Sequence, residues 1–511
     1  MASVRESREE FLTDCDYVVR APGSFFFSGE HSVEVGQPAL LIATDFWMYA
    51  GVKRRRAATF SITLTEPNPS APLDDEDMLD PALHYIAPTK LDKHLKGSLS
   101  ELRAGLREWQ QQTTGVSSFD LQVWSDFPFA VGLNAGAALS ACLGMILYFE
   151  EKKAANDDPL NIKELNRQVL EFANQDYQLL QQNEAFQRIF CLGRWCDNLL
   201  SGRLQCGAAV YTSLARTVAN RHGANPGQIM FLFAETPDDV TVQPVEREKI
   251  DFVEQTAKIA TQKVYATRIA MPDWLETAYG MTLLYSGARA DSTPVHGELK
   301  HWHRMHVDLV SRLLWERLGE IPAEDIAKLQ PPIRYILEGA EGMTEKEKSL
   351  SRLPHEVYLS ALGMISLRIL EVLDPEVTTG GPSDLNKLII DNNKMLKAYG
   401  ILRPPLRTFK SQLRKEILPE SLREKCWLKI TGPGNGGDLI IFAKSNILRQ
   451  INKFLQGRFF LELKENEARW HEDFKNEQLP QIHCTSVTNN KFIPENCAAA
   501  FYTRNTRKKE T

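Results

Sequence analysis

A stretch rich in glycine and alanine that runs directly into an apolar helical pattern constrains the fold of this chain most. Residues 126–147 read DFPFAVGLNAGAALSACLGMIL, and the Ala- and Leu-rich part has helical periodicity. The first turn of a helix leaves backbone N–H groups without intrahelical partners, and small side chains let an anion approach them. Phosphate is the usual anion at such a position. The stretch therefore predicts a phosphate site, with a helix start packed tightly against a neighbour as the alternative interpretation.

The composition indicates a soluble globular protein of two or more domains. The chain has 511 residues, of which 43% are hydrophobic and 25% charged, and its net charge is −6. This charge balance gives no reason to expect a nucleic-acid partner. The first twenty residues are too polar for a signal peptide, and no run of about 18 apolar residues predicts a membrane span. The eight cysteines include no CxxC pair, which favours reduced thiols in a cytoplasmic protein.

Strands are expected near the start of the chain and directly before the small-residue stretch. Residues 39–43 and 46–53 are rich in aliphatic and aromatic residues, and residues 119–125 alternate as a strand does. Helical patterns cover residues 91–112 and 162–190, whereas residues 193–213 are expected to form a mixed loop. The remaining pattern predicts helices over residues 302–399 and strands at 426–430 and 438–443.

Three separated stretches resemble, in the same order, the signatures of the GHMP kinases, a family that includes galactokinase, homoserine kinase, mevalonate kinase and phosphomevalonate kinase. Residues 21–40, APGSFFFSGEHSVEVGQPAL, are similar to the mevalonate kinase pattern of APGK, GEH and Gly-x-Pro-Ala-Leu. Residues 132–140, GLNAGAALS, stand where the family has a GLGSSAA-type phosphate loop. Residues 429–442, KITGPGNGGDLIIF, are similar to the KxTGxGxGGC loop. One such loop is weak support for a family, but three in order are strong support.

The resemblance implies a two-lobed α/β fold of the α+β kind, with a ribosomal-S5-like phosphate loop in the N-terminal lobe. The active site then lies in the cleft between the N-terminal lobe and a C-terminal α/β lobe. We expect the N-terminal lobe at residues 1–215 and the C-terminal lobe at residues 216–455. Residues 456–511 are expected to form an extension, a helix followed by a flexible basic tail.

The resemblance also implies an ATP-dependent phosphotransferase that acts on an alcohol group, with ATP and Mg²⁺ as cofactors. The second and third motifs of the family meet around ATP. On this basis the expected ATP-binding residues are Gly132, Leu133, Asn134, Ala135, Gly136, Ala137, Ala138, Gly432, Gly434 and Gly436.

The expected catalytic and substrate residues come from two further matches. Asp197 and Asn198, followed by Ser201, resemble the Asp-Asn pair of mevalonate-type kinases. Asp197 is the expected general base and Asn198 an expected substrate ligand, the alternative being that Asp197 stabilises a turn. Glu30 and His31 match the GEH motif and are expected to hold the substrate, with a surface turn as the alternative.

Several positions depart from the family pattern. Ser24 occupies the catalytic place where mevalonate kinases have a lysine, so a cation must come from elsewhere, with Arg194, Arg203 and Arg289 as candidates. Two residues of the phosphate loop, Ala135 and Gly136, replace serines, one of which normally contacts Mg²⁺. Glu184 is the nearest acid to the position of the family's metal-binding glutamate, although it is slightly out of register.

A mevalonate-like acid is the best substrate interpretation, because Val33 replaces the aspartate with which galactokinases hold the sugar; Glu34 beside it leaves a sugar or polyol open. We thus expect a cytoplasmic kinase that binds ATP and a small substrate, needs no nucleic acid or membrane, and can form a homodimer. A second hypothesis is a catalytically impaired GHMP fold that binds nucleotide or metabolite as a regulator or scaffold. A decarboxylase of the same fold is disfavoured because the GEH motif is kinase-like.

Overall fold

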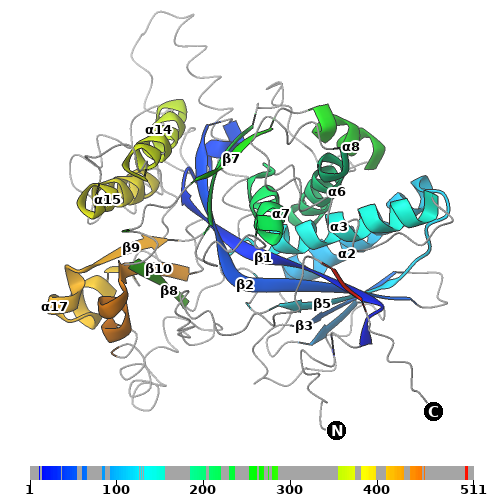
Figure 1. Cartoon of the computed structure of the whole chain (residues 1–511), viewed down its shortest axis with the longest axis horizontal. Coiled ribbons are helices and arrows are strands. Elements are labelled where there is room, and N and C mark those ends of the chain that lie inside the picture. Colours follow the sequence, from blue (N-terminus) through cyan, green and yellow to red (C-terminus); the bar gives the residue numbers. More distant parts are fainter. Residues whose placement is uncertain are drawn as a thin grey trace, which may run out of the picture.

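The fold is a mixed α/β arrangement of two sheets and their covering helices (Figure 1), as the sequence predicts. The computed structural model describes residues 11, 14–35, 37–54, 60–65, 83–86, 93–125, 127, 129, 132–155, 184–202, 206–219, 229–235, 252–261, 264–269, 274, 279–285, 355–373, 381–398, 410–411, 413–430, 438–451, 454 and 501–503.

The larger sheet is built around two long strands that pair antiparallel. These are β1 (Tyr17–Ser28) and β2 (Ala39–Lys53), and their register shifts twice along β1. One shift lies at Pro22, which has no N–H to donate to the ladder. The main order of the sheet is β11 (Phe501–Thr503), β1, β2, β5 (Asp120–Ser125), β3 (Ser61–Thr65) and β4 (Leu83–Ile86).

On the edge that faces away from β1, the length of β2 lets it pair with two further strands. Its second half pairs with β5, and its first half pairs with β6 (Ile229–Glu235), which pairs in turn with β7 (Val264–Ile269). The larger sheet thus includes strands on both sides of the expected boundary at residues 215/216. That boundary stays a prediction.

Layers of helices cover one face of this sheet. The inner helices α3 (Ala135–Ala155) and α7 (Ala208–Ala219) lie on β1 and β2, and α6 (Glu184–Ser201) packs on α3. The outer helices α2 (Lys93–Gln112) and α8 (Phe252–Thr261) pack against α6 (Figure 1). Nearly all of α3 is buried up to Glu150, as expected of a helix that is apolar all round.

The smaller sheet lies near four further helical segments. Its antiparallel order is β8 (Tyr279–Tyr285), β10 (Asp438–Lys444) and β9 (Cys426–Ile430). Around it lie the helical segments α14 (His355–Leu373), α15 (Pro382–Ala398), η3 (Leu413–Ile417) and α17 (Glu420–Arg423). The core continues from one sheet to the other, since Phe27 of β1 lies 6.3 Å from Phe442 of β10 between ring centroids.

Sequence prediction was accurate for several elements and wrong for one. The helix at 91–112 and the strands at 119–125, 426–430 and 438–443 are confirmed within a few residues. The loop expected from residue 193 is wrong, because α6 continues to Ser201 and holds Asp197 on a helix.

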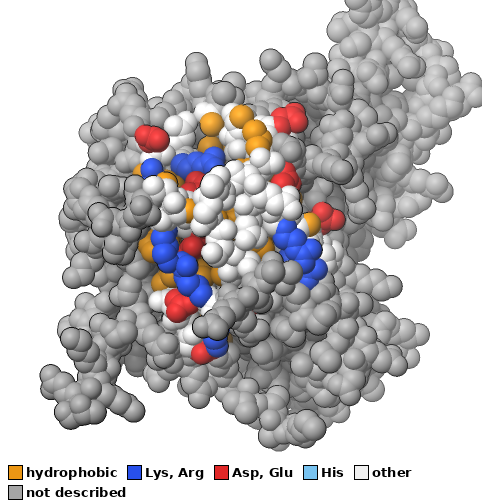
Figure 2. Space-filling view, turned by 90° about the vertical axis from the view of Figure 1, so that its right-hand side faces the viewer, with side chains coloured by type: hydrophobic (Ala, Val, Ile, Leu, Met, Phe, Trp, Pro, Cys, Tyr) orange, Lys and Arg blue, Asp and Glu red, His pale blue; other side chains and the backbone are white. Residues whose placement is uncertain are grey.

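The surface is of mixed charge on the side that Figure 2 shows. Lys and Arg side chains lie there beside Asp and Glu side chains and uncharged groups. None of the described helices combines the length and apolar composition that a membrane span requires.

Candidate active site

The chain turns sharply just before α3. Gly132 and Asn134 both have left-handed backbone conformations, with φ of 87° and 52°. Glycine adopts this conformation freely, and asparagine tolerates it better than most residues. The turn starts a 21-residue helix at Ala135, and the N–H of Ala138 makes its bond to the carbonyl of Asn134. The N–H groups of the residues between them have no intrahelical acceptor, so they offer the expected place for an anion.

The first motif holds this turn in place. The N–H of Ser24 donates to the carbonyl of Leu133 at 3.0 Å, and Asn134 Nδ2 donates to Ser24 Oγ at 3.2 Å. The preceding Gly23 is needed for close approach, because a Cβ there would lie 2.9 Å from Phe127 Cζ and 3.1 Å from the Leu133 carbonyl oxygen. Ser24 is fully buried. Where mevalonate kinases have a lysine, this chain therefore has a neutral hydrogen-bonding group that fixes the loop.

Asp197 reaches the start of α3 because two glycines allow α3 and α6 to pack backbone to backbone. A Cβ at Gly144 would lie 2.4 Å from the carbonyl oxygen of Ile189, and a Cβ at Gly193 would lie 3.0 Å from that of Ser140. One helical turn further on, a Cβ at Gly136 would lie 3.7 Å from Asp197 Oδ1. The contacts advance by four residues along each helix in opposite directions, so the helices run antiparallel and the Asp197 carboxylate ends beside the small-residue turn.

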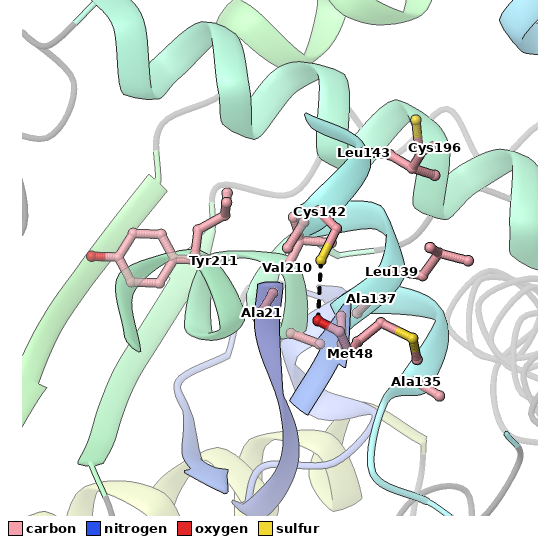
Figure 3. Close-up of a cluster of buried hydrophobic side chains, with 14 of the residues drawn as sticks. Ala21, Met48, Ala135, Ala137, Leu139, Cys142, Leu143, Cys196, Val210 and Tyr211 are labelled. Carbon is pink, nitrogen blue, oxygen red and sulfur yellow. Dashed lines mark hydrogen bonds between the residues drawn. The ribbon is translucent and has the colours of Figure 1, made fainter. Parts of the chain in front are cut away.

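Small and apolar side chains seat α3 on the sheet (Figure 3). Cys142 of α3 points toward Met48, and Cys142 Sγ donates to the carbonyl of Met48 at 3.5 Å. Burial raises the pKa of the Cys142 thiol well above its ordinary value, so this thiol stays protonated. For residues 126–147 the alternative to a phosphate site is a helix start packed tightly against a neighbour. The structure has both this tight packing and the turn.

Three polar residues lie close together in the C-terminal part of α6, which lies beside the turn before α3. Arg194, Asp197 and Asn198 are spaced for one face of a helix and are all at most 8% exposed. Of the three arginines expected to replace the missing lysine, the structure describes Arg194. Arg203 and Arg289 lie outside the described residues.

Glu184 begins α6, and its side chain is exposed. It lies 13 residues from Asp197 along one continuous helix, which is about 20 Å at the rise of an α-helix. The structure therefore does not bring Glu184 and Asp197 together. Within the described segments, no group of three or more His, Cys, Asp or Glu side chains could hold a metal ion.

Glu30 and His31 lie in a tight turn after β1. Gly29 before them has a φ of 84°, and His31 has the left-handed φ of 64°. Such a conformation is uncommon for histidine and is often found at functional sites. Both side chains are buried, so the alternative of a surface turn is wrong. Glu30 Oε1 forms an ion pair with Nζ of Lys429. Lys429 is the first residue of the third motif.

The third motif includes the end of β9 and most of β10, the two strands that the sequence predicts there. Residues 431–437 join these strands, and the predicted ATP ligands Gly432, Gly434 and Gly436 lie outside the described residues. Sequence reasoning missed Asn392 and Ser366, which lie with Glu30 and Lys429 in one buried network. Asn392 had a readable signal, because it interrupts the apolar face of α15 formed by Leu385, Ile389 and Leu396.

No protein-family model matches the sequence, and no curated protein matches it either. Solved structures do match. Galactokinase of Lactococcus lactis, complexed with galactose, is 13% identical, with 92% of this chain and 94% of that chain covered at a TM-score of 0.48. Phosphomevalonate kinase of Streptococcus pneumoniae, in complex with phosphomevalonate and AMPPNP, is 12% identical, with 86% and 95% covered at a TM-score of 0.44. Mevalonate kinase of L. major, in complex with R-mevalonate, is 11% identical, with 86% and 91% covered at a TM-score of 0.40. These matched structures are GHMP kinases, the family that the three sequence motifs of this chain resemble.

Proposed function

We propose that this protein is an ATP-dependent kinase of the GHMP type that phosphorylates a hydroxyl group of a small molecule in the cytoplasm. One observation carries the proposal: the carboxylate of Asp197 lies beside Gly136, in the first turn of α3. A proton acceptor and a phosphate-binding helix start are then adjacent, which is the arrangement that phosphoryl transfer to an alcohol needs.

The small-residue turn suits the phosphates of ATP. Gly132, Asn134 and residues 135–137 present backbone N–H groups and small side chains at the positive end of a long helix. Phosphoryl transfer depends on positioning and on neutralising charge more than on covalent help from the protein. Mg²⁺ in such sites is held by one or two carboxylates together with phosphate oxygens, and it would neutralise the charge of the phosphates.

The proposed roles of the remaining residues follow from their places. Asp197 accepts the proton of the substrate hydroxyl, Asn198 beside it orients the substrate, and buried Arg194 supplies the positive charge that Ser24 lacks. His31, held in its left-handed turn, contributes to the substrate pocket. A mevalonate-like acid stays the best substrate proposal, since Val33 is apolar and buried where galactokinases have an aspartate.

A second candidate is a catalytically impaired GHMP fold that binds a nucleotide or metabolite and acts as a regulator. Ser24 favours it, because this side chain is neutral and is engaged with Asn134 where mevalonate kinases have a cation. Such a protein would bind Mg·ATP without turnover.

The test compares Asp197→Asn with Asp120→Asn. Both aspartates are buried. Asp120, however, lies at the start of β5, where it accepts a hydrogen bond from Ser61 Oγ, away from the turn before α3. Calorimetry with Mg·ATP measures binding, and ADP release is measured with mevalonate, sugars and inositols. The kinase proposal predicts that Asp197→Asn lowers kcat by at least ~100-fold and leaves the Kd of Mg·ATP within about threefold. Asp120→Asn should retain turnover.

Three other results have distinct meanings. Binding of Mg·ATP without turnover on any substrate supports the regulator. Turnover that survives Asp197→Asn refutes the assigned base. A wild-type chain that binds no nucleotide refutes the proposed role of the turn.

A further inference from the structure

Five polar side chains form a continuous buried network between the larger sheet and the C-terminal helices and sheet. Ser366 Oγ donates to Ser28 Oγ at 2.9 Å, and Ser28 Oγ donates to Asn392 Oδ1 at 3.1 Å. Asn392 Nδ2 then donates to Glu30 Oε2 at 3.3 Å, and Glu30 Oε1 pairs with Lys429 Nζ. We name this network the lobe clasp; its members are Ser28, Glu30, Ser366, Asn392 and Lys429.

The side chains of the lobe clasp are buried, and their polar groups are hydrogen-bonded to one another. Glu30 and Lys429 are each 2% exposed, and the three neutral members are fully buried. A carboxylate and an ammonium group at such depth are costly unless they are paired and hydrogen-bonded. Lys429 Nζ also donates to the carbonyl of Ile430 at 3.2 Å. Both carboxylate oxygens of Glu30 therefore have partners inside the protein, which leaves this side chain poorly suited to hold a substrate hydroxyl.

The lobe clasp joins segments that are far apart in the chain. Glu30 follows the strand whose Ser24 holds the turn before α3. Lys429 lies 399 residues further on, in the strand β9 that leads directly into residues 431–437. Asn392 and Ser366 anchor α15 and α14 to the same point. The ion pair thus connects the first sequence motif with the third.

We propose that Glu30 and Lys429 are positioning residues, whose ion pair sets the position of β9 relative to the turn before α3. Buried ion pairs add little net stability compared with apolar residues, but they are well suited to fix register. The lobe clasp acts on ligand binding through the backbone of β9 and does not touch the ligand. The inference rests on the proposed function in one respect, that the ligand is Mg·ATP.

The test compares Glu30→Gln with Glu150→Gln. Glu150 is also a buried carboxylate, which accepts hydrogen bonds from Tyr17 Oη at 2.8 Å and from Arg54 Nη2 at 2.9 Å, but its partners lie in β1 and directly after β2. Both variants should unfold at lower temperature than the wild type. Glu30→Gln should weaken Mg·ATP binding about tenfold, as a coupling of ordinary size would do. Glu150→Gln should leave the Kd within about twofold.

A second measurement does not depend on nucleotide. Amide hydrogen exchange of residues 426–430 should become faster in Glu30→Gln and stay unchanged in Glu150→Gln, because only the first loses an anchor of β9. The double variant Glu30→Gln, Lys429→Gln leaves no unpaired charge and should recover part of the lost affinity and protection. If Glu30→Gln does not fold, Ser366→Ala removes one neutral bond of the lobe clasp and should accelerate the same exchange.

The outcomes separate the two proposals. Equal changes in Kd and exchange for Glu30→Gln and Glu150→Gln, or no change for either, overturn the lobe clasp as a positioning device. A wild-type chain without affinity for Mg·ATP overturns the proposed function, while the exchange experiment still decides on the lobe clasp.

Discussion

Replacing Gly144 by alanine tests how closely α3 and α6 must approach to form the site. The new Cβ would lie 2.4 Å from the Ile189 carbonyl oxygen and 2.8 Å from the Gly193 nitrogen, whereas ordinary contact begins at 3.4 Å. Both atoms belong to the backbone, so the helices themselves must separate, by about 1 Å. Overpacking of this kind costs ~1–3 kcal/mol, and the better helix propensity of alanine returns about 1 kcal/mol. We therefore expect a net loss of up to about 2 kcal/mol.

Gly97→Ala is the matched control. Gly97 also lies inside a helix, α2, but a Cβ there meets nothing within 4 Å. The same chemical change should therefore stabilise the protein by ~0.5–1 kcal/mol through helix propensity alone.

Urea unfolding measures both variants, and the expected shifts in midpoint have opposite signs. Separation of the helices also moves Asp197 away from the start of α3, so Gly144→Ala should lower turnover, while Gly97→Ala keeps it. A Gly144→Ala variant as stable as Gly97→Ala would refute the backbone contact on which the site is built.

Two further predictions concern Ser24 and Lys410. Ser24→Ala removes the acceptor of Asn134 Nδ2, so the turn before α3 loses about 1 kcal/mol of support, and calorimetry should show Mg·ATP binding ~3–10-fold weaker; an unchanged Kd would contradict the role of this bond. Burial, and then the positive charges of Lys429 and Arg414, lower the pKa of Lys410 from 10.5 to about 7. Between these two pKa values the unfolded chain binds a proton that the folded chain does not. The free energy of unfolding of the wild type, relative to that of Lys410→Met, should therefore rise from pH 7 to pH 8.5. The rise is at most about 1.4 kcal/mol per pH unit. Urea titrations of both proteins at the two pH values check this, and a difference that does not change with pH would speak against the buried amine.

Much of the fold could be predicted because its signals are local. The alternation in residues 119–125 and the apolar run after residue 134 report strand and helix directly. The positions of Gly132 and Asn134 in left-handed conformations agree with a turn that the composition of the stretch favours. Local patterns were misleading at Asp197, where Gly193 and nearby small residues resemble a loop. The helix persists there because Gly193 packs on the backbone of α3, a contact that lies outside any local window.

The lobe clasp could not have been predicted in the same way. A polar residue on the apolar face of α15 indicates that Asn392 is buried, but not which group it meets. Its partner Glu30 lies 362 residues earlier, and Lys429 reaches the same carboxylate from a third segment. Motif spacing places each residue along the chain, whereas their meeting depends on how two sheets and two helices pack together.

The pairing of β11 with β1 has a consequence for how the chain is made. Tyr17, Val18 and Val19 of the first long strand pair with Thr503, Tyr502 and Phe501 (Figure 1). Domains fold during synthesis as their residues emerge, yet this side of β1 has to wait until residues 501–503 have been made. Until then the strand presents unpaired backbone groups of the kind that attract other chains. A deletion that removes residues 501–503 would thus reopen an edge at the opposite end of the sequence, and the nascent protein would be expected to need a chaperone at β1.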